Sequence, residues 1–453
     1  MFERFSVFAG AASIGAVASV CCDDTVDEVV VMDAVVELVD QSLVIAELGD
    51  VSARYRSLET MRAFARDRLR QRGDLDRFER AHAAHVAAQM GPLTERLRGA
   101  DELAALRELD QLWPDLRSAV AYAIGEADTD LAVRLVSGLA VEAMYRERIE
   151  VSGWADQILD LPGAEVHHLA SELLATAAVL DWRCGRAELG YSRAEKAYGI
   201  CLAEGRPPSV AVNLAVSACG TALGDHDIAP RARADTLARI PAGDLFTRVF
   251  LRQLDSMFSS YWGEPRMALK ILDEIEPESQ RLRNPLLLAQ GAWVRMVALL
   301  DVEPAAAVDV GNVAVDAAKA IRALWVVDAV TNYLTSALAA AGDLDDALQG
   351  VRVVLEHMAD GGGVQSLANT ARNGLLIFDR LGLPTEAATV VGWLTAHGSE
   401  MPGTAGMRQR ATEVIQRVEA NLDAQRFAVA ASHGQTFNDR DLVDFMLQHL
   451  PGA

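Results

Sequence analysis

The sequence has few of the residues on which common nucleotide and zinc sites depend. Lysine occurs only at Lys196, Lys270 and Lys319, and none of the three follows the glycine-rich turn that a phosphate-binding loop requires. The five cysteines form neither a C-x-x-C pair nor a zinc spacing. These absences exclude a P-loop and a cysteine-based zinc module. Scattered cysteines of odd number are typical of buried thiols in a reducing cytosol.

Positive charge is also scarce. The chain carries 64 acidic residues against 42 Lys and Arg, which gives a net charge of −22. Because affinity for nucleic acid comes mainly from neutralising phosphates, nucleic-acid binding is not expected. Phe5 to Val20 is apolar, but Glu3 and Arg4 cancel in front of it, and Val20 stands where signal cleavage needs a small residue. No other segment approaches the roughly 18 apolar residues of a spanning helix, so we expect a cytoplasmic protein without membrane contact.

The chain has only 14 prolines, and aromatic residues make up 6% of it, whereas Ala and Leu recur throughout. This composition favours helix. An internal repeat gives the helices an order, because six segments share a turn residue, mostly Gly, followed five positions later by a small residue. The segments are Gly185 to Gly190, Gly224 to Ala229, Gly263 to Ala268, Val302 to Ala307, Gly342 to Ala347 and Gly382 to Ala387. Their spacings of 39, 39, 39, 40 and 40 residues do not arise by chance.

Each segment has the residues of a helical hairpin. Gly takes the left-handed conformation that ends the first helix, and Asp, Glu or Pro opens the second. The small fifth residue lets the two helices approach closely. Stacked hairpins cover one another's apolar faces and build a superhelix with a concave inner wall. We therefore predict an all-α superhelix of repeats similar to the tetratricopeptide repeat, with helices longer than in that repeat's usual unit of about 34 residues.

Residues 1–57 depart from the repeat. Two helices are expected at residues 14–21 and 31–41. Two strands are expected to follow at residues 43–46 and 53–56, joined by a turn at Gly49-Asp50. This order is that of a winged helix, whose second helix needs basic residues to read DNA. Here that helix carries Asp33, Glu37 and Asp40 and no Lys or Arg. The module is therefore not expected to read DNA.

Five motifs are familiar: Phe5-Ser-Val-Phe-Ala-Gly10, Leu38-Val-Asp-Gln-Ser-Leu43, Tyr55-Arg-Ser-Leu-Glu-Thr-Met-Arg62, Ala388-Thr-Val-Val-Gly392 and Asp423-Ala-Gln-Arg-Phe427. They resemble the predicted ATPases of the LuxR/SARP regulator group, in which an NTPase module of the STAND class precedes a winged helix and a long tetratricopeptide-like region. The resemblance covers almost the whole chain. It implies that the ATP-handling part lies upstream of Met1 and that Met1 falls within the winged helix.

The predicted division has four parts: a winged-helix-like remnant (1–57), a helical linker with the first helical pairs (58–165), tetratricopeptide-like repeats (166–400) and C-terminal capping helices (401–453). Trp113-Pro114 is expected to start a helix, Gly361-Gly-Gly363 to form a loop, and Asn438 with Asp441 to cap a last helix through Leu447.

Few side chains in the sequence have the spacing that a catalytic site or a metal site requires. His82 and His85 share a helix face without a third ligand, and Asp225-His226-Asp227 fills a repeat turn where Asp caps helices. Both are interpreted as structural, and His167-His168 as solvated. No catalytic residue, metal or cofactor is predicted.

Two surfaces are candidates for binding. Arg62, Arg66 and Arg70 form a stripe on the helix from Leu58 to Gln71, either a solvated face or a dock for an acidic partner. Counting back 3, 6, 10 and 13 residues from the repeat turns gives concave positions that either bind a ligand or pack in the core. These positions include Trp182, Thr221, Phe250, Gln253, Met257, Ser260, Asn332, Ser336, Asn369 and Arg372.

The sequence therefore predicts a non-catalytic regulatory or scaffold protein in signal transduction or transcription regulation. Its helical-repeat surface would bind a protein, such as a separate NTPase or cyclase regulator, or a small effector on the concave face. The alternatives are a residual winged-helix DNA-binding regulator, a decayed fragment of an ATPase regulator, and an enzyme, for which no constellation of residues is found.

Overall fold

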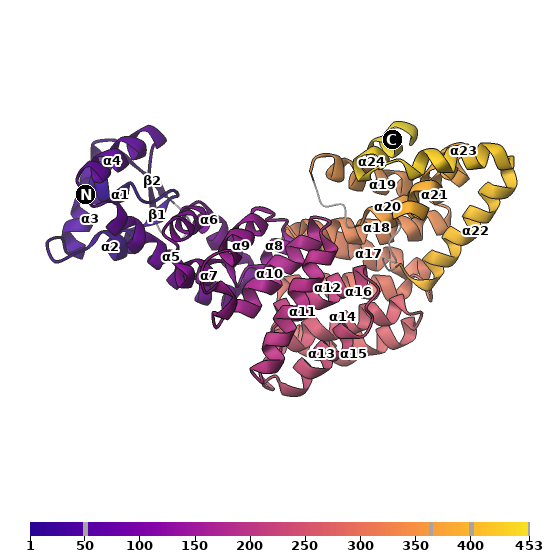
Figure 1. Cartoon of the computed structure of the whole chain (residues 1–453), viewed down its shortest axis with the longest axis horizontal. Helices are drawn as coiled ribbons and strands as arrows, with labels where there is room; N and C mark the ends of the chain where they lie inside the picture. The colour runs from indigo at the N-terminus through magenta and orange to yellow at the C-terminus, as the bar shows by residue number, and fades with distance from the viewer. Residues whose placement is uncertain (49–52, 362–365, 398–402, 452–453) are drawn as a thin grey trace. The chain divides into compact units, whose positions relative to one another are not determined.

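The computed structural model describes residues 1–48, 53–361, 366–397 and 403–451 (Figure 1). Within these ranges it contains 24 α-helices, one 3-10 helix and one three-stranded sheet, so the predicted all-α repeat fold is confirmed. The packing groups the chain into two units. Unit 1 is Met1–Leu139 with Gly153–Leu173, and unit 2 is Ala140–Ser152 with Leu174–Ala453. The four-part division drawn from the sequence stays a prediction.

Unit 1 begins with a small α/β module. Its elements are α1 (Phe2–Phe5), β1 (Ala12–Ser13), α2 (Ile14–Cys21), α3 (Glu28–Asp40), β2 (Val44–Leu48) and β3 (Ala53–Ser57). The antiparallel sheet has the order β1-β3-β2, with Ala12 opposite Tyr55 and Val44 opposite Ser57. The two predicted helices and two predicted strands are present. The short strand β1 was not predicted, and the turn at Gly49-Asp50 lies outside the described residues.

The rest of unit 1 is helical. It comprises α4 (Glu59–Gln71), α5 (Leu75–Leu97), α6 (Glu102–Gly125), α7 (Thr129–Val136), most of α9 (Glu150–Leu159) and the 3-10 helix η1 (Ala164–Val166). The expected helix start at Trp113-Pro114 is wrong, because Pro114 lies inside α6. The buried side chains of Leu109, Leu112 and Leu116 hold this helix continuous across the proline. Trp113 packs on Trp154 of α9 with ring centroids 5.6 Å apart.

Unit 2 consists of helical hairpins. Each pairs a first, inner helix with an outer one: α10 (Ala170–Arg183) with α11 (Ala187–Ala203), α12 (Val210–Ala222) with α13 (Ile228–Arg239), α14 (Leu245–Tyr261) with α15 (Pro265–Leu282), α16 (Pro285–Leu299) with α17 (Pro304–Ala320), α18 (Leu324–Ala341) with α19 (Leu344–Ala359), and α20 (Leu367–Arg380) with α21 (Pro384–His397). Successive inner helices from α12 to α20 contact one another and form one wall. The helices α22 (Ala405–Asn421), α23 (Ala424–Gln435) and α24 (Asp439–His449) follow.

The repeat turns have the predicted geometry. Five of the six turn positions are glycines with positive φ, between +68° and +99°, and the sixth, Val302, is not among the positive-φ residues. The small residues five positions later are all buried. The predicted cap of the last helix is also confirmed, because Asn438 and Asp441 form a reciprocal capping box at the start of α24. Of the predicted glycine loop, Gly362 and Gly363 lie outside the described residues.

One helix among the described residues, α18, is long and apolar enough to cross a membrane by length and composition. In this structure 61% of it is buried in the protein. Its apolar side chains are explained by its place in the inner wall, between α16 and α20.

We predict that Gly190→Ala will lower the free energy of unfolding of the repeat unit by about 1–3 kcal/mol. A Cβ atom at Gly190 would lie 2.8 Å from the carbonyl oxygen of Ala178 and 3.0 Å from Cys219 Sγ, so α10 and α11 would have to move apart. Chemical denaturation followed by circular dichroism measures the loss.

The matched control is Gly199→Ala on the same helix. A Cβ atom at exposed Gly199 meets nothing within 4 Å, so the substitution should raise stability by about 0.5–1 kcal/mol through helix propensity. Equal effects of the two substitutions would contradict the close approach at Gly190.

Candidate functional site

A segment from before the repeats forms part of the inner wall of unit 2. The segment Ala140–Ser152 contains α8 (Ala140–Tyr145), which contacts α18. Tyr145 is 1% exposed, and its hydroxyl donates a hydrogen bond to Gln290 Oε1. Its ring lies edge-on to Trp325 with centroids 5.3 Å apart. Tyr145 therefore inserts between the inner helices α16 and α18.

Four charged side chains hold this segment in place. Glu147 lies two residues after the end of α8. Its carboxylate pairs with Arg183 of α10 and lies 3.1 Å from His357 Nε2. His357 Nδ1 lies 2.6 Å from Asp328 Oδ2 on α18. Glu147 also has a φ of +55°, a left-handed conformation that costs a non-glycine residue about 1 kcal/mol. The ion pairs offset that strain, and we call these four residues the charged latch.

The pKa values of the latch follow from its contacts. The hydrogen bonds to Asp328 and Glu147 raise the pKa of His357 to about 10. Burial alone would raise the pKa of Glu147, but the hydrogen bond from His357 and the charge of Arg183 outweigh burial and lower it. His357 is therefore a cation at neutral pH and bridges two carboxylates.

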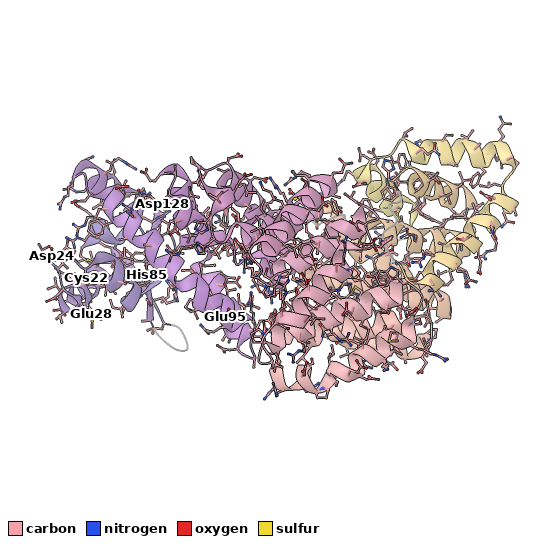
Figure 2. All side chains as sticks on the ribbon, turned by 60° about the horizontal axis from the view of Figure 1, so that its bottom comes forward. Cys22, Asp24, Glu28, His85, Glu95 and Asp128 are labelled. Atoms are coloured by element: carbon pink, nitrogen blue, oxygen red, sulfur yellow. The ribbon has the colours of Figure 1, made fainter. Side chains whose placement is uncertain are left out.

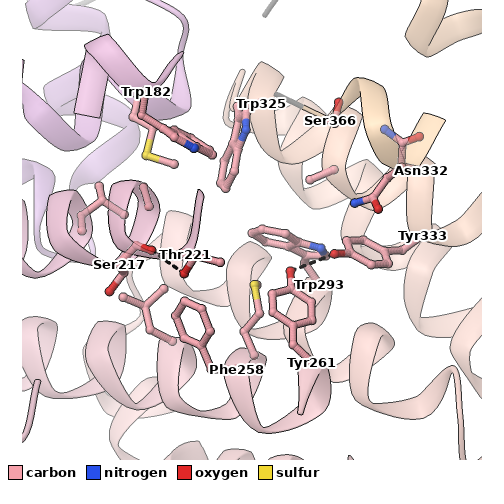
Figure 3. A pocket seen from close by; sticks show the side chains of 17 residues that line it. Trp182, Ser217, Thr221, Phe258, Tyr261, Trp293, Trp325, Asn332, Tyr333 and Ser366 are labelled. Carbon is pink, nitrogen blue, oxygen red and sulfur yellow. Dashed lines mark hydrogen bonds between the residues drawn. The ribbon is translucent and has the colours of Figure 1, made fainter. Parts of the chain in front are cut away.

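An apolar cavity of about 110 Å³ lies against the inner helices of unit 2 (Figure 3). Every inner helix from α10 to α20 contributes to its lining, and Met144 of α8 adds a side chain from the inserted segment. The larger lining side chains are Trp182, Trp293, Trp325, Phe258, Tyr261, Tyr333 and Met257. Trp325 is edge-on to both other tryptophans, at centroid distances of 5.3 Å from Trp293 and 6.2 Å from Trp182. A cavity of about this size lined by apolar side chains can hold a benzene ring.

Polar atoms in the cavity are few. The hydroxyls of Tyr261 and Tyr333 lie 2.8 Å apart and bond to each other (Figure 3). The indole N–H of Trp293 has no hydrogen-bond partner among the residues that the structure describes, although the residue is only 3% exposed. A buried donor without a partner costs free energy, so this N–H is an unsatisfied donor at the cavity wall.

A second, more polar cavity of about 380 Å³ adjoins the first. The two cavities share Thr221, Phe258 and Tyr261. The lining of the second also includes Arg233, Arg372 and Arg408 and, at a repeat turn, Asp225 and His226. We call the two the aromatic cavity and the arginine chamber.

The predicted concave residues fall into three groups in the structure. Trp182, Thr221, Met257, Asn332 and Asn369 line the aromatic cavity, and Thr221 also lines the arginine chamber with Arg372. The remaining four are buried within the helix stack: Phe250, Gln253, Ser260 and Ser336. Whether any of these residues binds a ligand stays a prediction.

Sequence reasoning missed several lining residues. Trp293 lies nine residues before the turn residue Val302, between the counted offsets of 6 and 10. Trp325 is the second residue of its helix, also outside the counted positions. Tyr261 lies two residues before its turn glycine. The concentration of aromatic residues on the inner helices of a chain with few aromatics was the available signal.

The arginine stripe on α4 is paired within unit 1. Arg62 lies 3.4 Å from Glu59, Arg70 lies 3.2 Å from Asp67, and Arg66 pairs with Glu79 of α5. Docking of an acidic partner at this stripe would therefore compete with existing ion pairs.

The histidines interpreted as structural make intramolecular hydrogen bonds. His82 Nε2 lies 3.0 Å from Asp115 Oδ1, which also accepts from the backbone N–H of Ala9, and His85 Nδ1 lies 2.9 Å from Ser19 Oγ. At the repeat turn, Asp225 accepts from the backbone N–H groups of Asp227 and Ile228 at the start of α13, as a capping residue does.

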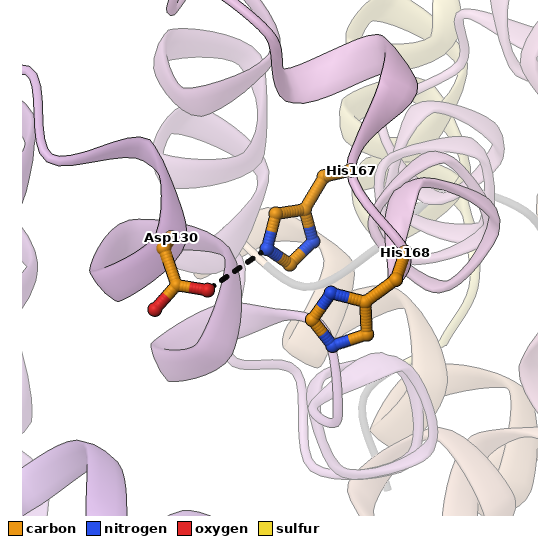
Figure 4. Close-up of side chains that lie close together, drawn as sticks. All are labelled: Asp130, His167 and His168. Carbon is orange, nitrogen blue, oxygen red and sulfur yellow. Dashed lines mark hydrogen bonds and ion pairs between the residues drawn. The ribbon is translucent and has the colours of Figure 1, made fainter.

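His168 is exposed, as expected, whereas His167 is only half-exposed and pairs with Asp130 of α7 (Figure 4). Their nitrogen atoms and the carboxylate lie within 4.8 Å of one another. However, His167 Nδ1 accepts from the N–H of Leu169, which leaves the proton of the neutral ring on Nε2, 3.2 Å from Asp130 Oδ1. A metal would need a lone pair at that nitrogen, so the arrangement is that of a hydrogen-bonded pair.

The second helix of the winged-helix-like module presents acidic and apolar side chains. On α3, Asp33, Glu37 and Asp40 are exposed, and Val29 and Val36 are 65% and 57% exposed. Asp24 and Glu28 lie nearby at the same end of the module (Figure 2). This face repels phosphate groups.

Comparison with known proteins gives a distant relationship. No family model matches the sequence. Three curated relatives, two from strains of Mycobacterium tuberculosis and one from Mycobacterium bovis, each bear the name "Putative HTH-type transcriptional regulator". The chain is 27% identical to each over 251 residues, which cover 53% of this chain and 28% of the relative. The chain thus matches less than a third of the length of these relatives.

We predict that the charged latch makes stability fall with rising pH. The pKa of His357 is raised in the folded state, so its contribution is complete below its unfolded pKa, about 6.5, and is lost as the pH rises through about 10. His357→Gln should lower the free energy of unfolding by about 1–3 kcal/mol at pH 7 and flatten its decline between pH 7 and pH 10. Urea unfolding at a series of pH values measures both effects.

His433→Gln on α23 removes an exposed histidine and is the control. A pH profile of the His357 variant that runs parallel to the wild-type profile would show that His357 does not bridge the two carboxylates.

Proposed function

We propose that this chain is a non-catalytic regulatory protein, of the kind found in transcription regulation, whose repeat unit binds a small effector in the aromatic cavity. The observation that carries the proposal is the convergence of Trp182, Trp293 and Trp325 on one cavity. Mostly apolar walls with a few placed polar groups are what small-molecule sites require.

The inserted segment provides a route from binding to regulation. Met144 lines the aromatic cavity, and its segment, Ala140–Ser152, is flanked in the sequence on both sides by residues of unit 1. A ligand that contacts Met144 changes the free energy of α8 in its inserted position. Because a ligand shifts a conformational equilibrium by its differential affinity for the two states, such a contact couples occupancy to unit 1.

The partner in this proposal is a second regulatory protein. The resemblance to STAND-class regulators implies one that carries an NTPase module, and the names of the curated relatives support transcription as the setting. An enzymatic role is disfavoured by the fold and the relatives.

DNA binding by the winged-helix-like module is the alternative. The strand order β1-β3-β2 and the HTH name of the relatives favour it. The exposed Asp33, Glu37 and Asp40 on α3 oppose it, because phosphate contacts supply most of the affinity for DNA. We therefore prefer effector binding.

We predict that an uncharged fluorescent probe, N-phenyl-1-naphthylamine, binds the full chain with its phenyl ring in the aromatic cavity, and that its fluorescence rises to saturation. Ala218→Phe places a ring in the cavity from a half-exposed lining position, and it should weaken probe binding by about tenfold or more. Fluorescence titration measures the affinity, and thermal unfolding confirms that the variant folds.

Ala317→Phe on the outer helix α17 adds the same ring at a half-exposed position and should bind the probe like the wild type. If the two variants bind the probe equally, the cavity is not a ligand site and the proposed function fails.

The regulatory role has its own test in the native host. We predict that a strain carrying Ala218→Phe will show the transcript changes of a strain that lacks the protein, whereas Ala317→Phe will match the wild type. The physical reason is that a filled cavity cannot respond to its effector. If the strain carrying Ala218→Phe has the same transcripts as the wild type, effector-controlled regulation is contradicted.

A further inference from the structure

The arginine chamber adds charge next to an apolar cavity. It is lined by Arg233, Arg372 and Arg408, with Asp225 as the acidic residue of the lining. The whole chain has a net charge of −22, so a chamber lined by three arginines differs sharply from the rest of the molecule. Clefts lined by one sign of charge attract ligands of the opposite sign.

The three arginines have different surroundings. Arg233 is 2% exposed and satisfied, because its guanidinium lies 2.7 Å from Asp255 Oδ1 and donates to Ser217 Oγ at 3.1 Å. Arg372 donates to Asn369 Oδ1 at 2.9 Å. Asn369 in turn lines the aromatic cavity. Arg372 therefore stands at the border of the two cavities.

Arg408 comes from α22, outside the repeats. Its guanidinium donates to the backbone carbonyls of Tyr261, at 2.9 Å, and of Gly403. Among the described residues no carboxylate pairs with Arg408, and two carbonyls leave part of its five N–H donors unused. The contact with Tyr261 fixes this charge beside the aromatic cavity.

Like charges meet in the chamber. Burial lowers the pKa of Arg372, and the neighbouring charge of Arg408 lowers it further. Two guanidinium groups that destabilise each other are both stabilised by an anion placed between them, and a guanidinium binds a planar oxyanion through two parallel hydrogen bonds. The chamber at about 380 Å³ has room for such a group.

We propose that the effector is a small amphipathic acid, with an apolar ring or chain in the aromatic cavity and one anionic group between Arg372 and Arg408. The shared residues Thr221, Phe258 and Tyr261 lie where the two parts of the ligand join. The unpaired N–H of Trp293 then donates to a polar atom on the apolar part. This proposal rests on effector binding in the aromatic cavity and specifies the chemistry of the effector.

Two probes with one skeleton test the proposal on the full chain. 1-Anilinonaphthalene-8-sulfonate carries a single anionic group, and N-phenyl-1-naphthylamine lacks it. We expect the sulfonate to bind the wild type about tenfold more tightly than the uncharged probe at low salt, and we expect added salt to reduce this advantage. Arg408→Gln should abolish the advantage and leave the affinity for the uncharged probe unchanged.

Arg426→Gln is the matched control, because Arg426 on α23 is exposed and the substitution removes the same charge from the chain. Arg408 is itself exposed, so its loss should not unfold the protein, and thermal unfolding checks this. A second variant, Arg372→Gln, should reduce the same ratio.

The outcomes separate the two proposals. If the two probes bind the wild type equally, or if Arg408→Gln and Arg426→Gln change the affinity ratio alike, the acidic ligand is excluded while the aromatic cavity stands. If Ala218→Phe leaves the binding of both probes intact, effector binding in the cavity fails and the acidic ligand fails with it. Selective loss of the sulfonate advantage in the Arg408 and Arg372 variants supports the amphipathic acid.

Discussion

The close approach of two helices in each hairpin is the constraint on which unit 2 depends. Gly190 shows it most clearly, because a Cβ atom there would reach the backbone of Ala178 on the paired helix. Gly or Ala at the same place in every hairpin keeps the inner and outer helices at one repeating distance. Similar hairpins then stack on one another, so their inner helices share a wall. Side chains distant in sequence, such as Trp182 and Trp325, meet on that wall.

The wall is completed by residues that do not belong to the repeats. Tyr145 inserts from α8, and Arg408 arrives from α22 and bonds to the end of α14. The repeats thus provide apolar area and a regular frame, whereas the added segments provide a latch and a charge. The inner wall therefore draws on three parts of the chain: the repeats, α8 and α22.

The spacing of glycine and small residues predicted the repeats, because few structures other than stacked helical hairpins require such residues at a fixed interval. Counting back from the turn glycines then predicted positions on the inner wall, and two of them, Thr221 and Asn332, line the aromatic cavity. Trp293 was missed because it lies nine residues before its turn residue, Val302, and nine is not one of the counted offsets. The predicted helix start at Pro114 was wrong because buried leucines on both sides outweigh the cost of an internal proline. The insertion of Tyr145 and the meeting of Glu147 with His357 could not be predicted, since such long-range contacts leave no local pattern in the sequence.

The position of α8 in the chain also bears on how the protein is made. Tyr145 is synthesised long before Gln290 and Trp325, the residues between which it packs. At about 5–20 residues per second, the ribosome needs about 10–40 s to advance from Tyr145 to Trp325. During that interval the apolar face of α8 has no completed wall to join, although α10 and α12 are synthesised within it. The nascent chain therefore exposes the apolar side chains of α8 until the later repeats have been synthesised. Protection by a chaperone matters most during this interval.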